Sequence, residues 1–380
     1  MPPHPIRVYL QHLVDDGTIA GAVYLVGDRD QTIYLEAVGY RDLEAKDRLA
    51  PDSMFWIAST TKPVTATALM MLVDEGKVRL DDPVEKYLPE FKGQKVMPQQ
   101  HPLGTDSQLT TGVGVVAPLM KAARPIRVRE ILSHTSGLPF RSLKQPGALD
   151  LLPLQDQVKS FAAEPLMFQP GTDFSYSNEG FNTAARIIEV VSGEPYEKFL
   201  QEHIFDPLGM SDTTFWPGSA QIARLAKSYK LDPATNRLVA TKIDQLTYPL
   251  DDRRRRYPVA AGGLFSTAAD VEKFCRMILD GGVANGHRFV SEESLREMTT
   301  RQNGLLNEQG YGLGWTVAGA TIGHGGAYKN TMEIDRAAGR IFLFMVQQSG
   351  DWGTSRGNSM GANLDRMGRE LEKAPAPAER

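Results

Sequence analysis

The sequence predicts a mixed α and β fold in which one antiparallel sheet, built from both chain ends and flanked by helices, carries an inserted, mostly helical region. Runs rich in β-branched and aromatic residues stand near the N-terminus and again after residue 310, whereas helical spacing dominates between about 125 and 210. The 380 residues, 41% of them hydrophobic, can bury a large core as one big domain or as two. The economical arrangement brings the terminal strands into one sheet.

The first part of the chain alternates helices and strands. The pattern predicts a helix over 5–14, strands over 20–27 and 32–40, a helix that follows Ser59 and ends at Gly76, and a short helix over 81–89 with Pro83 in its first turn.

The rest of the chain passes from an irregular stretch through helices to strands. The pattern predicts an irregular excursion over 92–125, a helix starting near 266 with capping-box spacing between Thr267 and Asp270, strands over 311–317, 320–326, 331–335 and 340–348, a final helix over 359–372, and a disordered tail over 373–380. We therefore expect a sheet domain made of 1–62 and 240–372, and a mostly helical domain over 63–239.

Composition excludes several classes of protein. The net charge of -4 argues against a general nucleic-acid binder, and the single cysteine, Cys275, cannot form an intrachain disulfide. No apolar run approaches the length of a membrane span, and the N-terminus carries charges where a secretory signal needs an apolar stretch. The histidines lack metal-ligand spacing. We expect a cytoplasmic protein without a metal or cofactor, without nucleic-acid or membrane partners, and of an oligomeric state that the sequence leaves open.

The stretch "FWIASTTKPVTA", residues 55–66, places a hydroxyl and an amine three residues apart, at Ser59 and Lys62. Positions i and i+3 share one helix face, and Pro63 favours a helix start close by. Ser59 would then lie near backbone N–H groups that favour a developing oxyanion. Taken alone, the pattern is weak evidence of catalysis, because serine is a common N-cap and lysine is common everywhere.

Two later segments carry further polar groups. "FSYSNEG", residues 174–180, puts Tyr176 and Asn178 in a loop that enters a helix, where both can face one cleft; alternatively the tyrosine packs on the loop and Asn178 caps the helix. "GHGGA", residues 323–327, puts two glycines behind His324, which lets another backbone or a substrate approach a strand edge, unless the segment is a plain turn.

Together and in this order, these three motifs resemble those of the serine hydrolases that include class C β-lactamases, D-alanyl-D-alanine peptidases, D-aminopeptidases and family VIII carboxylesterases. That family carries S-x-x-K, then Y-x-N, then K-T-G, H-x-G or W-G-G. The resemblance covers nearly the whole chain, because further segments are similar to the family's connecting segments: "ILSHTSGLP" (131–139), "IFDPLGMSDTTF" (204–215), "AAGGLFSTAADVEKF" (260–274) and "YGLGW" (311–315). It implies a β-lactamase-like fold.

The resemblance also implies a role for each matched residue. Ser59 would be the nucleophile that forms an acyl-enzyme, Lys62 its base, and Tyr176 the group that protonates the leaving group and helps to activate water. The backbone N–H groups of Ser59 and Ala327 would form the oxyanion hole. The remaining matched residues would bind substrate or orient Lys62: Asn178, His324, Gly325 and Gly326.

His324 stands where the β-lactamases have the lysine of K-T-G, which attracts a substrate carboxylate. A histidine is mostly neutral at pH 7, so the sequence favours a carboxylesterase for short-chain acyl esters, with weak β-lactam hydrolysis as a side activity. The alternatives are a β-lactamase, a D-alanyl-D-alanine carboxypeptidase or a D-aminopeptidase that uses the same site. An alternative of a different class is a non-catalytic member that only binds ligands.

Three other motifs also suggest functional residues. "GTSRG" around Ser355 matches a hydrolase elbow, but that fold needs a histidine after the serine, and the last histidine is His324. His134 in "SHTSG" is a tempting general base, although histidines in such loops more often satisfy local backbone groups. The run Arg253, Arg254, Arg255 and Arg256 predicts a solvated loop, or else a cleft rim that attracts anions.

Overall fold

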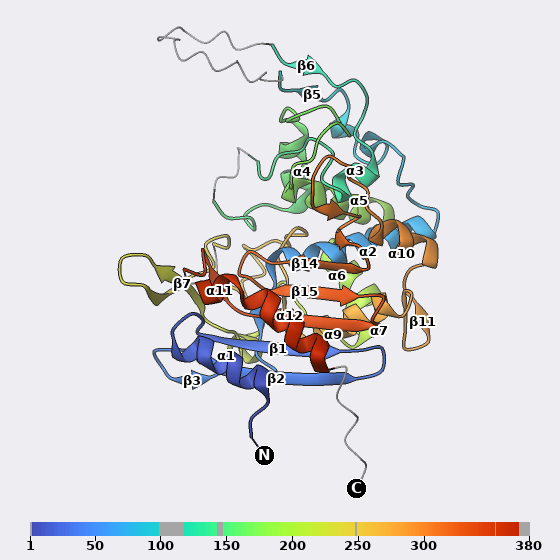
Figure 1. The fold of residues 1–380 in the computed structure, drawn as a ribbon. Coiled ribbons are helices and arrows are strands. Elements are labelled where there is room, and N and C mark those ends of the chain that lie inside the picture. Colours follow the sequence, from blue (N-terminus) through green and yellow to red (C-terminus); the bar gives the residue numbers. More distant parts are fainter. Residues whose placement is uncertain (1, 99–117, 143–146, 248, 354, 372–380) are drawn as a thin grey trace, which may run out of the picture.

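The computed structural model describes residues 2–98, 118–142, 147–247, 249–353 and 355–371 (Figure 1). Much of the expected excursion over 92–125 and the whole of the expected disordered tail over 373–380 lie outside the described residues. The proposed division into a sheet domain and a helical domain, at 62/63 and 239/240, stays a prediction.

An eight-stranded antiparallel sheet joins the two ends of the chain, which confirms the predicted fold class (Figure 1). Its strands stand in the order β12 (Gly310–Tyr311), β13 (Thr316–Ala318), β14 (Thr321–Gly325), β15 (Thr331–Asp335), β16 (Arg340–Met345), β1 (Gly21–Gly27), β2 (Thr32–Asp42) and β3 (Asp47–Arg48).

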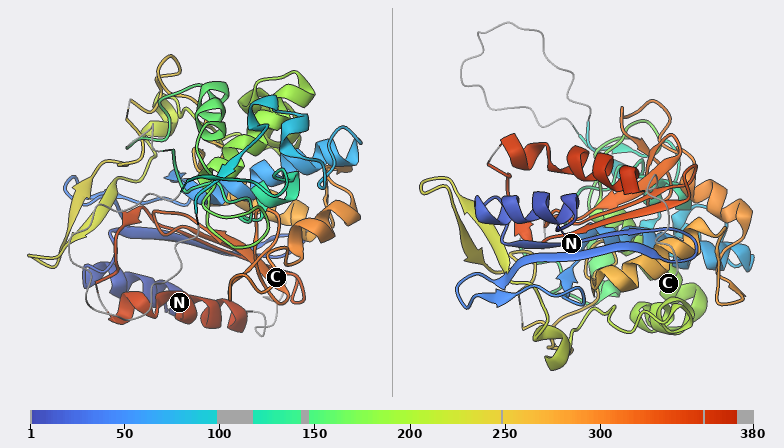
Figure 2. Two further views of the ribbon diagram at one scale, coloured as in Figure 1. Left: turned by 90° about the horizontal axis from the view of Figure 1, so that it is seen from above. Right: turned by 60° about the horizontal axis from the view of Figure 1, so that its bottom comes forward.

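The joint between the two ends is the pair β1 and β16. Val23 lies opposite Met345 and Tyr24 opposite Phe344, and every residue of β1 is buried. Because side chains alternate along a strand, Val23 packs into the larger core on one face of the sheet, while Tyr24 packs on the other face. The sheet is therefore covered on both sides, as Figure 2 also shows.

The two terminal helices cover one face of the sheet side by side: α1 (Pro5–Asp15) and α12 (Met360–Glu370) (Figures 1 and 2). The amide of Asn363 donates to the hydroxyl of Tyr9 at 3.1 Å, which ties the two helices together. Leu10 and Leu364 are buried in the same cluster under them.

The opposite face carries α2 (Thr61–Asp74) and α9 (Ala268–Leu279), and the helical region stands above α2 (Figure 1). Because α2 lies between the sheet and the helical region, it is buried on every side from Thr61 to Leu72. α5 (Asn178–Ser192) packs on α2 and on α3 (Val128–Leu132). Gly180 permits the second contact, since a Cβ atom there would lie 2.5 Å from the carbonyl oxygen of Ile131.

The other elements are short. The helices are α4 (Leu154–Ala162), α6 (Tyr196–Leu200), α7 (Asp206–Leu208), α8 (Ser219–Ile222), α10 (Glu292–Thr299) and α11 (Ser355–Asn358), with a π-helical turn at Gln201–Phe205. The two-stranded sheets pair β4 (Phe55–Trp56) with β9 (Phe265–Ser266), β5 (Lys95–Val96) with β6 (Met120–Lys121), and β10 (Val283–Ala284) with β11 (His287–Arg288). A three-stranded sheet has β7 (Ser228–Asp232) in the middle, between β17 (Gln348–Ser349) and β8 (Arg237–Thr241).

Three local predictions need correction. The single strand expected over 311–317 is two short strands, β12 and β13, which pair antiparallel across the turn between them. The expected helix over 81–89 is a pair of 3₁₀ turns, Val84–Lys86 and Pro89–Phe91, because Pro89 has no N–H group and keeps the residue before it out of the helical region. The expected capping box of α9 is only half formed. Thr267 accepts from the amide of Asp270 at 3.2 Å, but the Asp270 carboxylate accepts from the amide of Asp212 instead.

The arginine run is not simply a solvated loop. Arg256 is buried and pairs with the buried carboxylate of Asp150 at 2.7 Å, and it also donates to the carbonyls of Phe215 and Leu250. Arg253, Arg254 and Arg255 are exposed, with Arg253 over the ring of Trp216. The fourth arginine therefore fastens this loop to the segment that carries Asp150.

We expect Arg256→Ala to lower the free energy of unfolding by about 3–5 kcal/mol, because it leaves the Asp150 carboxylate buried without its partner. Arg254→Ala, in the same loop but exposed, is the matched control and should change it by less than about 0.5 kcal/mol. Urea unfolding followed by circular dichroism measures both. Equal stability of the two variants would contradict the structural role of Arg256.

Candidate active site

Ser59 is the one residue between Ser53 and Leu72 that is not buried. It lies in a 3₁₀ turn, Ala58–Thr60, that leads directly into α2. The sequence therefore placed the serine correctly at a helix start. The serine does not cap the helix, since Thr60 holds the cap position and no side chain makes a capping bond there. Ser59 is thus partly exposed, while the residues on both sides of it are buried.

The turn that carries Ser59 holds an alanine in a left-handed conformation, at Ala58 with φ of +46°. An L-residue pays about 1–2 kcal/mol for that region. Contacts on both sides fix the turn: the Thr61 hydroxyl donates to the Ala58 carbonyl at 2.7 Å, and the Ile57 amide donates to Leu264 at 3.0 Å. Strain of this kind is common at functional sites.

Lys62 is completely buried, and its Nζ touches three oxygens. These are Ser59 Oγ at 3.1 Å, Asn178 Oδ1 at 2.8 Å and the Ala261 carbonyl at 2.7 Å. Burial holds the pKa of the Lys62 amine well below its usual value. No carboxylate in the described part of the chain pairs with it to offset that effect.

The three contacts of Lys62 suit a neutral amine. Asn178 Oδ1 and the Ala261 carbonyl can only accept, so they take the two N–H groups of the neutral form. The lone pair of Nζ is then left for the third neighbour, the hydroxyl of Ser59. An amine held in this way can accept the proton of Ser59 without first losing one of its own.

Tyr176 comes from the loop before α5, and its ring lies next to the amine of Lys62. Lys62 Nζ is 4.6 Å from the centre of the Tyr176 ring. Burial raises the pKa of the Tyr176 hydroxyl, and a hydrogen bond with Ser59 acts weakly the other way, so the hydroxyl keeps its proton at neutral pH. The structure thus brings Ser59, Lys62, Tyr176 and Asn178 together.

Asn178 reaches Lys62 because another residue caps α5. The Ser177 hydroxyl accepts from the amide of Gly180 at 3.1 Å, whereas Asn178 is the first helical residue. The alternative in which Asn178 caps this helix is therefore wrong. With the cap provided by Ser177, the amide side chain of Asn178 turns to the amine.

His324 lies on β14 and is almost fully buried. Its Nδ1 donates to the Gly325 carbonyl at 2.8 Å, and its Nε2 accepts from the hydroxyl of Tyr311 at 3.0 Å. Burial and the nearby charge of Lys62 lower the pKa of the imidazole to about 3. His324 is neutral, and both of its nitrogens are already bonded.

The glycines after His324 bring β14 against the Ser59 turn. A Cβ atom on Gly326 would lie 2.7 Å from the Ile57 carbonyl oxygen, so only glycine fits there. Ala327, next in the chain, is exposed, and neither its amide nor that of Ser59 has an acceptor among the described residues. Two free N–H groups on adjoining segments are what an oxyanion hole requires, although that role stays a prediction.

Sequence reasoning missed three groups of this site. The Ala261 carbonyl and Tyr311 belong to the segments "AAGGLFS" and "YGLGW", whose connecting roles gave no chemical signal. Glu179 is buried beside Asn178, neither of its carboxyl oxygens has a hydrogen bond among the described residues, and burial raises its pKa to about 9. A lone glutamate in a helix pattern gives no hint of such burial.

The other candidates lie apart from this cluster. Ser355 begins the short helix α11 and is exposed, with no histidine among its contacts. One surface group, Glu194, Glu202 and His203, has ligand atoms within 4.8 Å of one another. The ammonium of Lys198 pairs with both glutamates.

The chain matches the family described as Beta-lactamase over residues 6–359. It belongs to the β-lactamase family. Protein Rv1367c of Mycobacterium tuberculosis is 30% identical over 90% of this chain and 89% of its own length, and Esterase EstB of Burkholderia gladioli is 26% identical over 86% of each chain. The structure of EstCE1, a hydrolase with promiscuous acyltransferase activity, superposes with a TM-score of 0.75 at 22% identity, covering 97% of each chain. Other matches carry the name penicillin-binding protein.

The protein is thus a serine hydrolase of the β-lactamase and penicillin-binding protein superfamily, as the motifs predicted. No helix in the described ranges combines the length and apolar character needed to cross a membrane.

The pH dependence of acylation should follow Lys62. The amine is a base only when it is neutral, and burial lowers its pKa. The value of kcat/KM should therefore rise with pH, and the midpoint of that rise should lie well below 10.5. It should stay high into the alkaline range, because Tyr176 keeps its proton there. Ester hydrolysis between about pH 5 and pH 10 measures this.

The matched control is His324→Gln. His324 is neutral across that range, so its loss should leave the midpoint in place even if the rate falls. A profile governed by a group near pH 4, or a midpoint that moves with His324→Gln, would contradict Lys62 as the base.

Proposed function

We propose that the protein is a carboxylesterase that hydrolyses short-chain acyl esters through an acyl-enzyme on Ser59. The observation that carries the proposal is the state of His324. This residue replaces the lysine that would attract a substrate carboxylate, and it is neutral, buried and bonded at both nitrogens. A site without that positive charge favours uncharged acyl esters over peptides and β-lactams, which bear a carboxylate.

Acylation follows from the contacts of Ser59. Lys62 takes the hydroxyl proton across 3.1 Å as Oγ attacks the ester carbonyl carbon. The amides of Ser59 and Ala327 receive the negative charge that forms on the carbonyl oxygen. When the C–O bond to the alcohol breaks, Tyr176 gives its hydroxyl proton to the leaving oxygen and regains one from the Lys62 ammonium.

Deacylation repeats these steps with water in place of the alcohol. Tyr176 and Lys62 together accept a proton from the water that attacks the acyl carbon, and Ser59 Oγ leaves as a hydroxyl. Esters ask less of Tyr176 than amides do, because an alkoxide or phenoxide leaves more readily than an unprotonated amine.

Similar proteins support this choice without deciding it. EstB is named an esterase and EstCE1 a hydrolase with acyltransferase activity. Within the arginine run that could restore a carboxylate anchor, Arg256 is engaged by Asp150 inside the protein, which leaves only the exposed Arg253, Arg254 and Arg255 for that role. The peptidase and β-lactamase activities remain the alternatives within the same site.

Ser59→Ala should lower kcat on the order of 10⁶-fold, since the nucleophile of a cooperating set is lost. It should also abolish covalent labelling by a phosphonate, read by intact mass. Ser355→Ala, the serine of the competing motif, should leave rate and labelling unchanged. Labelling that persists in Ser59→Ala would refute the nucleophile, and a wild-type protein that takes no label would favour the non-catalytic alternative.

Among substrates, p-nitrophenyl acetate and butyrate should give a higher kcat/KM than nitrocefin or a D-alanyl-D-alanine peptide. The physical reason is the missing positive charge at His324. Initial rates on the four compounds with one enzyme preparation decide the order. A larger kcat/KM for nitrocefin or for the peptide would replace the esterase assignment with the corresponding alternative.

A further inference from the structure

His134 contacts Tyr176 and the residues on either side of it at three points. The His134 carbonyl accepts from the amide of Ser175 at 2.9 Å, and its Nδ1 accepts from the amide of Ser177 at 3.0 Å. Its ring packs on the Tyr176 ring with centres 4.3 Å apart. One residue thus holds the backbone before and after the tyrosine as well as the tyrosine ring.

These bonds exclude His134 as a general base. Because Nδ1 accepts the Ser177 amide, the single ring proton sits on Nε2, and no lone pair is left to take a proton. Nε2 is buried and has no acceptor in the part of the chain that the structure describes. Burial, with a smaller contribution from the nearby amine of Lys62, keeps the pKa of the ring well below its usual value.

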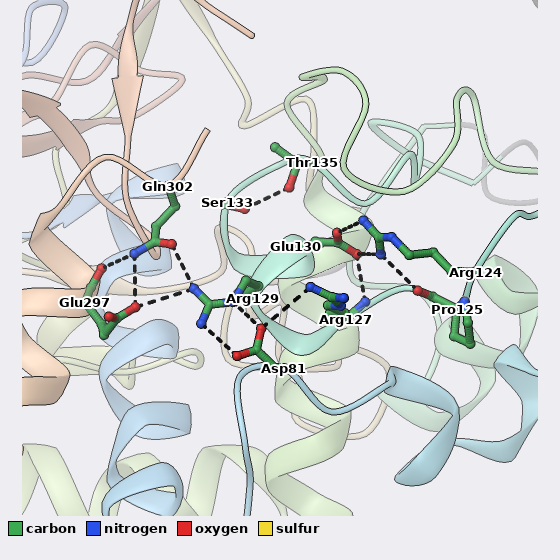
Figure 3. A network of polar contacts seen from close by, with 10 residues as sticks. All are labelled: Asp81, Arg124, Pro125, Arg127, Arg129, Glu130, Ser133, Thr135, Glu297 and Gln302. Atoms are coloured by element: carbon green, nitrogen blue, oxygen red, sulfur yellow. Dashed lines mark hydrogen bonds and ion pairs between the residues drawn. The ribbon is translucent and has the colours of Figure 1, made fainter. Parts of the chain in front are cut away.

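An ion pair and hydrogen bonds hold the segment that precedes His134. His134 follows α3, where Arg129 pairs with Asp81 at 2.7 Å, and Glu130 accepts from the amide of Arg127 at 2.8 Å (Figure 3). Figure 3 also shows Ser133 bonded to Thr135, across the turn that His134 occupies. His134 has a φ of +61° in this turn, a left-handed conformation that only a few side chains tolerate.

We propose that His134 is a positioning residue that clamps Tyr176 in the orientation from which it protonates the leaving group. This inference rests on the proposed function. It differs from a role in folding alone, because the clamp acts on the steps that need the Tyr176 hydroxyl, and only the protonation of the leaving group differs between esters of the same acid. The role of the clamp therefore depends on the leaving group.

Two esters with the same acyl group distinguish an effect on the position of Tyr176 from an effect on protein stability. Ethyl butyrate releases an ethoxide that needs a proton, whereas p-nitrophenyl butyrate releases a stable phenoxide. The ratio of their kcat/KM values does not depend on the fraction of enzyme that is folded. We expect Tyr176→Phe to lower the ethyl to p-nitrophenyl ratio by on the order of 10²-fold, and His134→Leu to lower it by roughly 10-fold to 10²-fold.

Three further variants sharpen the test. His134→Asn keeps an acceptor near the position of Nδ1 and tolerates positive φ, so it should retain most of the wild-type ratio. Phe174→Leu removes an edge contact on His134, with ring centres 5.8 Å apart, but keeps the two backbone bonds and the packing on Tyr176, so it should leave the ratio nearly unchanged. The double variant His134→Leu/Tyr176→Phe should be no worse than Tyr176→Phe alone, because both act through one hydroxyl.

An unchanged ratio in His134→Leu, or additive losses in the double variant, would overturn the proposal. A crystal structure of His134→Leu supplies a readout that needs no turnover, and Tyr176 found in its wild-type place would also overturn it. If the wild-type protein hydrolyses neither ester, the proposed function fails, and the position of Tyr176 in that crystal structure still decides for or against the clamp.

Discussion

The buried amine of Lys62 constrains every element around it, because a lysine nitrogen can be taken from water only if the surrounding structure meets its hydrogen bonds. α5 must present Asn178, the segment before β9 must present the Ala261 carbonyl, and the turn before α2 must present Ser59. Each requirement fixes one element relative to α2. The helical region, the Ser59 turn and the segment before β9 therefore meet at this nitrogen.

Backbone strain is concentrated in the same place. Three described non-glycine residues with positive φ lie in segments that build the site: Ala58 before Ser59, His134 beside Tyr176, and Lys329 in the turn after Ala327. Each such conformation costs about 1–2 kcal/mol and persists only where neighbours hold it. Those neighbours, including the ion pairs of α3, thus stabilise the geometry that the chemistry needs (Figure 3).

The sequence was sufficient to predict the pieces with a local signature. Runs rich in β-branched and aromatic residues revealed β1, β2, β14, β15 and β16, and the i, i+3 spacing placed Ser59 and Lys62 on one helix face. The burial of Arg256 against Asp150, the Ala261 carbonyl contact and the protonated Glu179 could not be foreseen, because each depends on segments far apart in the chain. The prediction that His134 has a structural role toward backbone groups holds, but the groups are not local: they are the amides of Ser175 and Ser177, about 40 residues further along the chain on either side of Tyr176.

The absence of a carboxylate partner within the described site explains how Lys62 can act as both acceptor and donor. A fixed negative charge would hold the amine as an ammonium and remove its basicity. Neutral groups stabilise the ammonium only as it forms: Asn178 Oδ1 and the Ala261 carbonyl accept from it, and the faces of Tyr176 and Phe181 lie 4.6 Å and 5.6 Å away. With His134 and His324 neutral beside it, the cleft tolerates one transient positive charge, and that charge is available to be returned as a proton when the ester bond breaks.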